Sequence, residues 1–241
     1  MNITSAKLSY SVCKQDNDEA IPVIIVAAGS SARMGGCDKQ LINISGIPVI
    51  ARTLLQFEKS PDISRIILVT RKSSIIEIQQ IAEKYLISKL SDIAEGGQTR
   101  QQSVLCGIAR LGENENKVLV SDGARMFVTN RMIHDCVTAL KEHDGCLCAV
   151  KVNDTVKSAE NGKVTGTVDR SNLYLAQTPQ GITVNLYKEA AEGADIEKLT
   201  DDASVLESKG FDVVIVDGDT KNIKITTPED IKLAEMYIKE N

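Results

Sequence analysis

The sequence has no hydrophobic run that approaches the roughly 20 residues of a membrane-spanning helix. Its first twenty residues, which are rich in Ser, Asn, Asp and Lys, also lack the apolar segment of a secretory signal peptide. These two absences argue against a membrane partner and predict a cytoplasmic protein. We interpret residues 1–20 as a tail or a peripheral strand that precedes the main domain.

Metal-binding side chains are scarce as well. The chain has only two histidines, His134 and His143, and neither has an acidic or cysteine partner at ligand spacing. The six cysteines are scattered without the regular spacing of a disulfide framework. We therefore expect no zinc site, surface positions for both histidines, and reduced, mostly buried thiols.

An excess of positive charge is also missing. The chain carries 28 Lys and Arg against 33 Asp and Glu, a net charge of −5, and the two signs are mixed along its length. A surface that binds the phosphate backbone of a nucleic acid usually has a basic stripe, so no nucleic-acid partner is expected. With 241 residues and 42% hydrophobic content, the chain is long enough for one large α/β domain, which we place at 21–241.

The stretch from Val23 to Leu41, VIIVAAGSSARMGGCDKQL, is the first candidate site. An apolar, β-branched run predicts a buried strand, after which the chain turns small and flexible and then supplies the cations Arg33 and Lys39. A strand, a glycine-containing loop and two cations indicate a phosphate-binding site. The spacing of Gly29 matches neither a Walker loop nor the dinucleotide fingerprint. An ordinary strand-to-helix turn with two surface cations is the alternative.

The chain then alternates between helical and strand patterns. Apolar residues at helical spacing follow Val49, and strand patterns occupy residues 65–70 and, more weakly, 87–93, with a helix over 75–85 between them. This alternation predicts an α/β fold with a doubly wound, mainly parallel, Rossmann-like sheet. In such a sheet, ligands bind at the carboxyl ends of the strands.

Two later segments place polar groups at that edge. GGQTRQQSV, residues 96–104, leads into a helix, and a glycine loop at a helix N-terminus favours anions and polar ligand edges. The strand Lys117–Ser121 ends in Asp122, with Arg125 three residues later. An acidic residue at the carboxyl end of a central strand lies where a metal, ribose or substrate binds. A capped helix and a capped turn are the structural alternatives for the two segments.

The remaining patterns predict a hairpin and more α/β elements. Residues 153–172 are polar and β-prone around Asn161-Gly162, which predicts a β-hairpin arm that has little of its own to bury. Thr200 is a suitable N-cap for a following helix, and Lys224 is placed in a short strand between two isoleucines. We also expect helices over 130–141 and 183–192, strands over 145–152 and 211–216, and a last helix that starts at Pro228.

These segments together resemble a known family. AAGSSARMG with DKQ, GGQTRQQSV, SDGARMFV, AQTPQ, TDDAS and NIKIT occur in the order of the 2-C-methyl-D-erythritol 4-phosphate cytidylyltransferases, and the resemblance runs from Val23 to the last helix. It implies transfer of CMP from CTP to the polyol phosphate, with release of pyrophosphate, in non-mevalonate isoprenoid biosynthesis. Mg²⁺ would be held by the CTP phosphates and not directly by the protein.

The resemblance also implies roles for single residues. Catalytic charge stabilisation falls to Arg33, Lys39 and Lys224. The CTP-binding set is Ala27, Ala28, Gly29, Ser30, Gly96, Gly97, Ser103, Asp122 and Gly123. The polyol phosphate would be positioned by Asp122, Arg125, Thr155, Arg170 and Thr200. In this family the arm reaches across a two-fold axis, which implies a homodimer in which Thr155 and Arg170 act on the substrate of the partner.

One segment departs from the family pattern. The chain has SDGARM where the family has HDAARP, so Ser121, Gly123 and Met126 differ, and the loss of the proline is expected to loosen this loop. Three alternatives stay open: a cytidylyltransferase for ribitol 5-phosphate or another polyol phosphate, a non-catalytic nucleotide-binding homologue, and a dinucleotide oxidoreductase. AQTPQ and TDDAS weigh against the first, and the missing dinucleotide fingerprint against the last.

Overall fold

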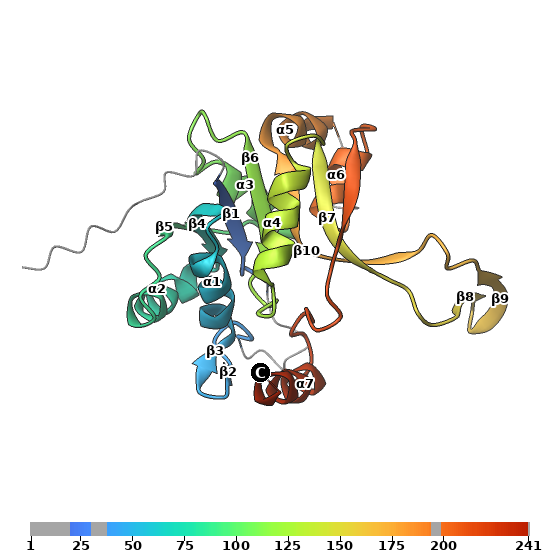
Figure 1. Cartoon of the computed structure of the whole chain (residues 1–241), viewed down its shortest axis with the longest axis horizontal. Helices are drawn as coiled ribbons and strands as arrows, with labels where there is room; N and C mark the ends of the chain where they lie inside the picture. Colours follow the sequence, from blue (N-terminus) through green and yellow to red (C-terminus); the bar gives the residue numbers. More distant parts are fainter. Residues whose placement is uncertain (1–19, 30–37, 194–198, 241) are drawn as a thin grey trace, which may run out of the picture.

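A seven-stranded sheet forms the centre of the molecule (Figure 1). The computed structural model describes residues 20–29, 38–193 and 199–240. In spatial order the strands are β11 (Val213–Asp217), β7 (Gly145–Lys151), β10 (Tyr174–Thr183), β6 (Lys117–Asp122), β1 (Ile21–Val26), β4 (Ile63–Thr70) and β5 (Leu90–Glu95). Strand β10 is antiparallel to β6 and β7, and the other neighbouring pairs are parallel. The expected mainly parallel sheet is therefore confirmed.

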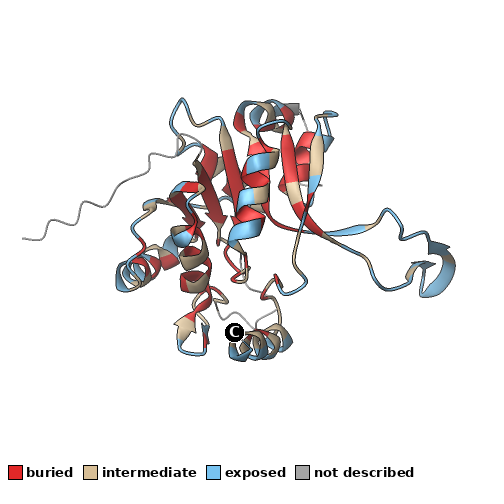
Figure 2. Ribbon diagram, in the orientation of Figure 1, coloured by how far each residue is buried: buried red, intermediate tan, exposed pale blue. Residues whose placement is uncertain are grey.

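Helices cover the sheet on two faces, as a doubly wound fold requires. One core receives side chains from α1 (Val49–Lys59), α2 (Ile75–Lys84) and α4 (Asn130–Ala139). The other receives side chains from α3 (Arg100–Ile108), α5 (Val184–Gly193) and α6 (Asp202–Glu207). Buried residues follow both faces of the strands (Figure 2). None of the described helices is long and apolar enough to cross a membrane.

The strand order places a topological switch at β1. The chain runs from β1 outward to β4 and β5 and then returns to form β6 on the other side of β1. The connections leave the carboxyl ends of β1 and β6 in opposite directions, which opens a crevice there. The loops after these two strands carry the motifs that the sequence singled out, so the fold brings them to one edge.

A smaller layer lies beyond the carboxyl edge of the sheet (Figure 1). It consists of β2 (Asn43–Ile44), β3 (Ile47–Pro48) and α7 (Pro228–Lys239), and a third apolar cluster joins β2 to α7. Thr227 caps α7 and its hydroxyl accepts from the Asp230 N–H, so the helix starts at Pro228 as predicted. The fully buried Ile225 belongs to this cluster and fixes the segment just before α7.

The predicted arm is a separate hairpin of β8 (Val156–Glu160) and β9 (Lys163–Val168). Asn161 and Gly162 form its turn with φ values of 50° and 78°, the left-handed region that this dipeptide adopts readily. The hairpin projects away from the sheet between the end of β7 and the start of β10 (Figure 1), and its residues are almost all exposed (Figure 2). The arm has no core of its own within this chain.

Three cysteines meet in the core between α4 and β7. Cys136, Cys146 and Cys148 are buried free thiols, and the sulfur atoms of Cys136 and Cys148 are 3.5 Å apart. Hydrogen bonding to the other two thiols, together with burial, raises the pKa of Cys136 well above its ordinary value. A thiol that resists ionisation is a poor nucleophile, so Cys136 is not a reactive thiol. The burial of all three cysteines makes them small core residues, as expected.

Several predicted boundaries need correction. The third strand, expected over 87–93, is β5 and runs to Glu95, while the strand expected over 211–216 starts only at Val213. Thr200 is not the cap of α6, because Asp201 accepts the capping hydrogen bond from Ser204 N. Residues around Lys224 form no strand: their backbone is held by single contacts such as Ile225 N to Ala124 O, 2.9 Å. The tail assigned to 1–20 lies outside the described residues apart from Ala20.

Candidate active site

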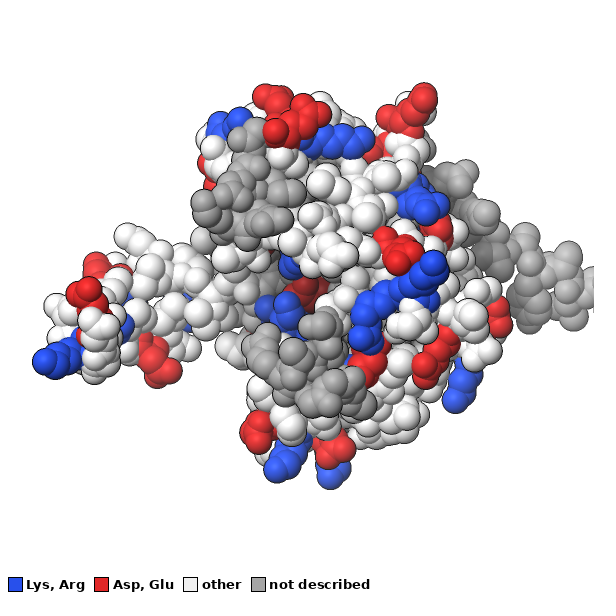
Figure 3. All heavy atoms as spheres, turned by 180° about the vertical axis from the view of Figure 1, so that it is seen from behind, with Lys and Arg blue, Asp and Glu red and all other residues white. Residues whose placement is uncertain are grey.

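A cavity of about 480 Å³ opens at the carboxyl edge of the sheet, at the switch between β1 and β6. In the space-filling view from behind, Lys and Arg atoms lie beside acidic atoms in a hollow near the middle of the molecule (Figure 3). The lining residues come from the ends of β1 and β6, from the first turn of α3 and from the segments between elements. They are Val26, Ala28, Gly29, Lys39, Gln40, Arg71, Gly97, Gln98, Thr99, Arg100, Ser103, Asp122, Ala124 and Lys224.

The loop after β1 forms one wall of this cavity. Ala27 N donates to Val69 O at 2.7 Å, which continues the sheet pairing by one residue, and Ala28 and Gly29 line the cavity directly. Ala27 itself is buried beneath this wall. Ser30 and Arg33, which the sequence assigned to CTP binding and catalysis, lie outside the described residues.

The loop before α3 packs closely against the first loop. A Cβ on Gly96 would fall 2.5 Å from the Ala28 Cβ and 2.8 Å from the Ser103 Oγ, so only glycine permits this approach. Gly97 and Ser103 line the cavity. Ser103 Oγ donates to Thr99 O at 2.9 Å and therefore presents its lone pairs to other groups. The two loops that the sequence identified separately thus form one continuous wall.

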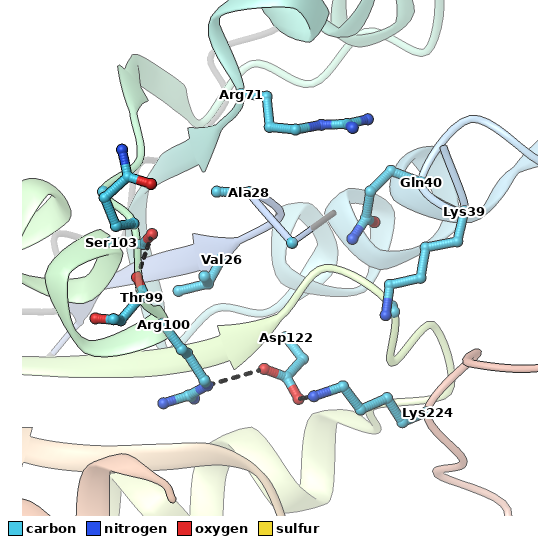
Figure 4. A pocket seen from close by; sticks show the side chains of 14 residues that line it. Val26, Ala28, Lys39, Gln40, Arg71, Thr99, Arg100, Ser103, Asp122 and Lys224 are labelled. Atoms are coloured by element: carbon cyan, nitrogen blue, oxygen red, sulfur yellow. Dashed lines mark hydrogen bonds and ion pairs between the residues drawn. The ribbon is translucent and has the colours of Figure 1, made fainter. Parts of the chain in front are cut away.

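Asp122 lies at the end of β6 at the floor of the cavity (Figure 4). Its Oδ2 is 2.7 Å from the Lys224 Nζ, and its Oδ1 is 3.4 Å from the Arg100 Nε. Its backbone N–H donates to Thr178 Oγ1 at 3.0 Å. Burial by itself would raise the pKa of Asp122, but the charges of Arg100 and Lys224 outweigh it and hold the pKa well below its ordinary value. The carboxylate is therefore ionised at neutral pH.

Arg100 is the main feature of the site that sequence reasoning missed. Its Nη2 lies 2.6 Å from the Oδ2 of the fully buried Asp202, while its Nε faces Asp122. Burial opposes the charge on Arg100, yet the charges of Asp202 and Asp122 raise its pKa above the ordinary value. Arg100 thereby ties the start of α3 to the end of β6 and the start of α6. The only signal in the sequence is its place in GGQTRQQSV.

Lys39 and Lys224 approach the cavity from separate elements. Lys39 follows the undescribed segment after β1, and Lys224 precedes α7. Figure 4 shows that Lys224 points at the Asp122 carboxylate, whereas Lys39 ends in the space above it. The alternation predicted for Lys224 holds although the strand does not form, because its neighbour Ile225 is buried while Lys224 lines the cavity.

Arg125 was expected to reach the substrate, and the structure gives it a different contact. Its Nη1 donates to Asn222 O at 2.6 Å, and its Nε lies 3.7 Å from the Asp122 Oδ2. It is not part of the cavity lining. Burial lowers the pKa of Arg125, partly offset by the charge of Asp122. In this chain the side chain braces the segment that carries Lys224.

The three departures in SDGARM are accommodated by packing. Ser121 is buried with its Oγ 3.2 Å from the Thr178 Oγ1, and Met126 is buried in the cluster shared with α7. A Cβ on Gly123 would lie 2.9 Å from the Gln40 Oε1. Gly123 therefore makes room for the buried amide of Gln40 on the cavity wall. Gly123 does not line the cavity itself, although its N–H holds Val26 O at 2.9 Å.

The remaining predicted residues lie away from this cavity. Thr155 and Arg170 are exposed on the arm, which projects from the sheet (Figure 1), and Thr200 is exposed just before α6. None of the three is among the lining residues. Around this cavity, a single chain therefore brings together most of the described groups assigned to CTP, but of those assigned to the polyol phosphate only Asp122 lines it.

The family model for IspD, 2-C-methyl-D-erythritol 4-phosphate cytidylyltransferase, matches residues 21–240. The chain belongs to this family. A curated IspD relative from Geobacter metallireducens is 42% identical over 228 residues, which cover 92% of this chain and 98% of the relative. One from Bacillus mycoides is 42% identical over 219 residues, covering 90% of this chain and 96% of the relative.

Solved IspD structures agree with the sequence relatives. The crystal structure of 4-diphosphocytidyl-2C-methyl-D-erythritol synthase from Anaerococcus prevotii has a TM-score of 0.81 at 32% identity, covering 92% of this chain and 97% of that one. The Francisella tularensis IspD structure has a TM-score of 0.74 at 30% identity, covering 90% and 99%. The fold and the nucleotidyltransferase activity expected from the sequence are thereby confirmed.

Proposed function

We propose that this chain transfers CMP from CTP to 2-C-methyl-D-erythritol 4-phosphate and releases pyrophosphate. The observation that carries the proposal is the cavity at the β1–β6 switch, which is lined by Lys39 and Lys224 and in which Lys224 pairs with the buried carboxylate of Asp122. Cations opposite a fixed, hydrogen-bonded anion suit a substrate that has both phosphate and hydroxyl groups. The CTP set assigned from the sequence lies around this cavity as far as it is described.

The loop after β1 and the loop before α3 would bind different parts of CTP. Ala28 and Gly29, continued by Ser30, would hold the triphosphate through backbone N–H groups. Gly96, Gly97 and Ser103 would hold the cytosine. Because the Ser103 hydroxyl already donates to Thr99 O, its oxygen is left as an acceptor. An acceptor at this point favours the amino group of cytosine over the keto oxygen of uracil.

The chemical step is an in-line displacement. An oxygen of the polyol phosphate attacks the α-phosphorus of CTP, a new P–O bond forms, and the bond to pyrophosphate breaks. Arg33, Lys39 and Lys224 would stabilise the charge that develops on the α-phosphoryl oxygens and the leaving group. No covalent intermediate on the protein is required, because positioning and charge stabilisation carry the reaction. The ion pair with Asp122 keeps the Lys224 ammonium group at the cavity wall.

Mg²⁺ fits this site as an ion that arrives with the nucleotide. Asp122 is the only carboxylate among the described lining residues, and its oxygens already face Arg100 and Lys224. Within the described ranges no group of three or more His, Cys, Asp or Glu residues is arranged to hold a metal. Mg²⁺ commonly binds substrate phosphates with few protein ligands. When bound, it would neutralise part of the triphosphate charge.

The polyol phosphate would be positioned by Asp122, Thr155, Arg170 and Thr200, while Arg125 would act indirectly, through its contact with the segment that carries Lys224. Since the arm projects from its own chain, we propose that Thr155 and Arg170 reach the cavity of a partner in a homodimer. Exposed apolar residues on and beside the arm, Val164 at 67% and Leu175 at 58%, support such a contact. A protein that uses CTP in this way would act in the cytoplasm, as the sequence predicted.

Pyrophosphate release measures the proposed activity directly. The purified protein is incubated with CTP, Mg²⁺ and, in turn, 2-C-methyl-D-erythritol 4-phosphate, ribitol 5-phosphate and erythritol 4-phosphate. We expect the methylerythritol substrate to give the highest kcat/KM. A higher value with ribitol 5-phosphate would favour the alternative polyol, and no release with any acceptor would favour a non-catalytic homologue.

A further inference from the structure

The turn that carries Lys39 is stabilised by the side chain before it. Leu41 N donates to Asp38 O at 3.0 Å, which closes a four-residue turn with Lys39 at its first corner. Gln40 N donates to the Asp38 Oδ1 at 3.1 Å, the hydrogen bond of an Asx-turn. The Asp38 carboxylate is therefore part of the local structure that sets where the Lys39 side chain begins.

The other oxygen of this carboxylate is held from a distant part of the chain. Asp38 Oδ2 accepts from Ser74 Oγ at 3.0 Å and forms an ion pair with the guanidinium of Arg71. Arg71 directly follows β4, so it lies at the same carboxyl edge as Asp122. Figure 4 shows its guanidinium extending toward the side of the cavity that carries Gln40 and Lys39. The Asp38 side chain is only 10% exposed and that of Arg71 is 32% exposed, so water screens this pair less than it would a fully exposed pair.

A second anchor attaches the same turn to α1. Ile50 N donates to Gln40 O at 3.0 Å, which fixes the far end of the turn. The near end adjoins the undescribed residues 30–37 and is fixed, among the described residues, by Asp38 through Arg71 and Ser74. The ion pair thus controls the end of the turn at which Lys39 lies.

We propose that Arg71 is a positioning residue that, through Asp38, directs Lys39 into the cavity. The inference rests on the proposed function, in which Lys39 stabilises the α-phosphoryl charge. Arginine suits this task because its planar fork holds a carboxylate in one orientation, which a flexible ammonium does not. A misplacement of about 1 Å in a positioned catalytic group can lower the rate by about 10²-fold.

Direct binding of the triphosphate by Arg71 is the competing explanation, since the residue lines the cavity. The two explanations differ in their consequences. If Arg71 bound CTP, its loss would raise the KM for CTP, and loss of Asp38 would free Arg71 and strengthen binding. If Arg71 acts through Asp38, loss of either partner lowers kcat, and loss of both costs no more than the larger single loss.

The test compares Arg71→Gln, Asp38→Asn and the double variant with the wild-type enzyme, and uses Lys72→Gln as a control. Lys72 is the adjacent exposed cation, so this control makes the same charge change outside the cavity. We expect kcat to fall by about 10- to 100-fold in each single variant, with the KM for CTP within about threefold. The kcat of the double variant should equal that of the less active single variant. Arg71→Lys should have a higher kcat than Arg71→Gln. Raised KM values, multiplicative losses or rates equal to those of Lys72→Gln would overturn the proposal.

A measurement without substrate separates this inference from the proposed function. Lysines are reductively methylated with ¹³C-formaldehyde, and the Lys39 signal is assigned by its loss in Lys39→Arg. We expect Arg71→Gln and Asp38→Asn to move the Lys39 signal toward those of exposed lysines, whereas Lys72→Gln leaves it unchanged. An unmoved signal in both variants would overturn the positioning role. If the two variants move the Lys39 signal but the wild-type protein has no cytidylyltransferase activity, the proposed function is refuted and the positioning role is not.

Discussion

The cavity and the arm are built on opposite principles. At the cavity floor, the buried Asp122 pairs with Arg100 from the start of α3 and with Lys224 from the segment before α7, and Arg100 also pairs with Asp202 at the start of α6. The geometry of this cluster therefore depends on contacts between distant parts of the chain. The arm is exposed and is held by a two-residue turn and its own strand pairing. The cavity can be assembled by one folded chain. The arm residues are exposed on this chain, and the proposed homodimer would bring them to the cavity of the partner.

This difference separates stability from function. Removing a charge from the cluster around Asp122 leaves its buried partners unpaired and lowers the stability of the fold. Removing a charge from the exposed arm leaves the contacts of the folded domain unchanged. A substitution in the arm that abolishes activity would therefore report on the substrate or the partner and not on folding. The expected effects below are arranged from the largest to the smallest on this basis.

Arg100→Gln should give the largest effect. It leaves the fully buried Asp202 and the buried Asp122 without their shared cation, and breaking one partner of a buried ion pair costs about 3–5 kcal/mol. Urea denaturation followed by circular dichroism measures the change in the free energy of unfolding. A loss below about 1 kcal/mol would show that the cluster does not hold the cavity together.

Lys39→Ala should lower kcat by about 10²–10³, the usual cost of losing one preorganised electrostatic donor. The same loss is predicted for Arg33→Ala, which lies outside the described residues. Because Lys39 lies on the cavity wall and in none of the apolar clusters, the free energy of unfolding should change by only about 0.5 kcal/mol. Near wild-type turnover in a folded variant would remove the catalytic assignment.

The sequence was sufficient for most of the elements and for the local part of the site. Periodicity located the main helices and the parallel strands, but β2, β3 and the antiparallel β10 were not predicted, and the strand expected at Lys224 does not form. The position of Asp122 at the end of a strand was enough to place it in the crevice. Thr200 shows the limit of local reasoning. Thr200 and Asp201 are both good caps, and the choice depends on Gln180, which donates to the Asp201 carboxylate at 3.0 Å from β10.

Arg100 and Arg71 could not be assigned from the sequence for the same reason. Arg100 meets Asp202 across 102 positions, and Arg71 meets Asp38 across 33, so no local pattern links either pair. Arg71 could have been a candidate on the rule that selected Asp122, since it also directly follows a strand. The arm residues Thr155 and Arg170 came from the resemblance alone, and their role stays a prediction.

Ser103→Ala should reduce the preference for CTP over UTP, measured as the ratio of kcat/KM values in competition. Loss of the acceptor that faces the amino group should cost about 1–3 kcal/mol in discrimination. Arg170→Gln, on the arm, should leave the ratio unchanged because it is remote from the base wall. Equal use of CTP and UTP by the wild-type enzyme would contradict the base-pocket assignment. ATP should be a poor substrate, because a purine would collide with the Gly96–Ser103 loop.

Arg170→Gln should have the smallest effect on folding. The residue is exposed, and substitutions at such positions usually change the free energy of unfolding by no more than about 0.5 kcal/mol. Its kcat/KM for the polyol phosphate should nevertheless fall, since a planar bidentate donor to the phosphate is lost. A large loss of stability would mean that the arm is part of the folded core. The arm would then depend on contacts with the rest of the chain, as the cavity does.

Mixed dimers test the shared site most directly. Arg170→Ala and Lys39→Ala subunits, each inactive alone, are refolded together, and the heterodimers are isolated by two different affinity tags. If each site combines one chain's cavity with the partner's arm, one site carries both substitutions and the other carries neither. We predict about half of wild-type activity per heterodimer. If each site is built within one chain, every site keeps one substitution, and heterodimers without activity would contradict the shared site.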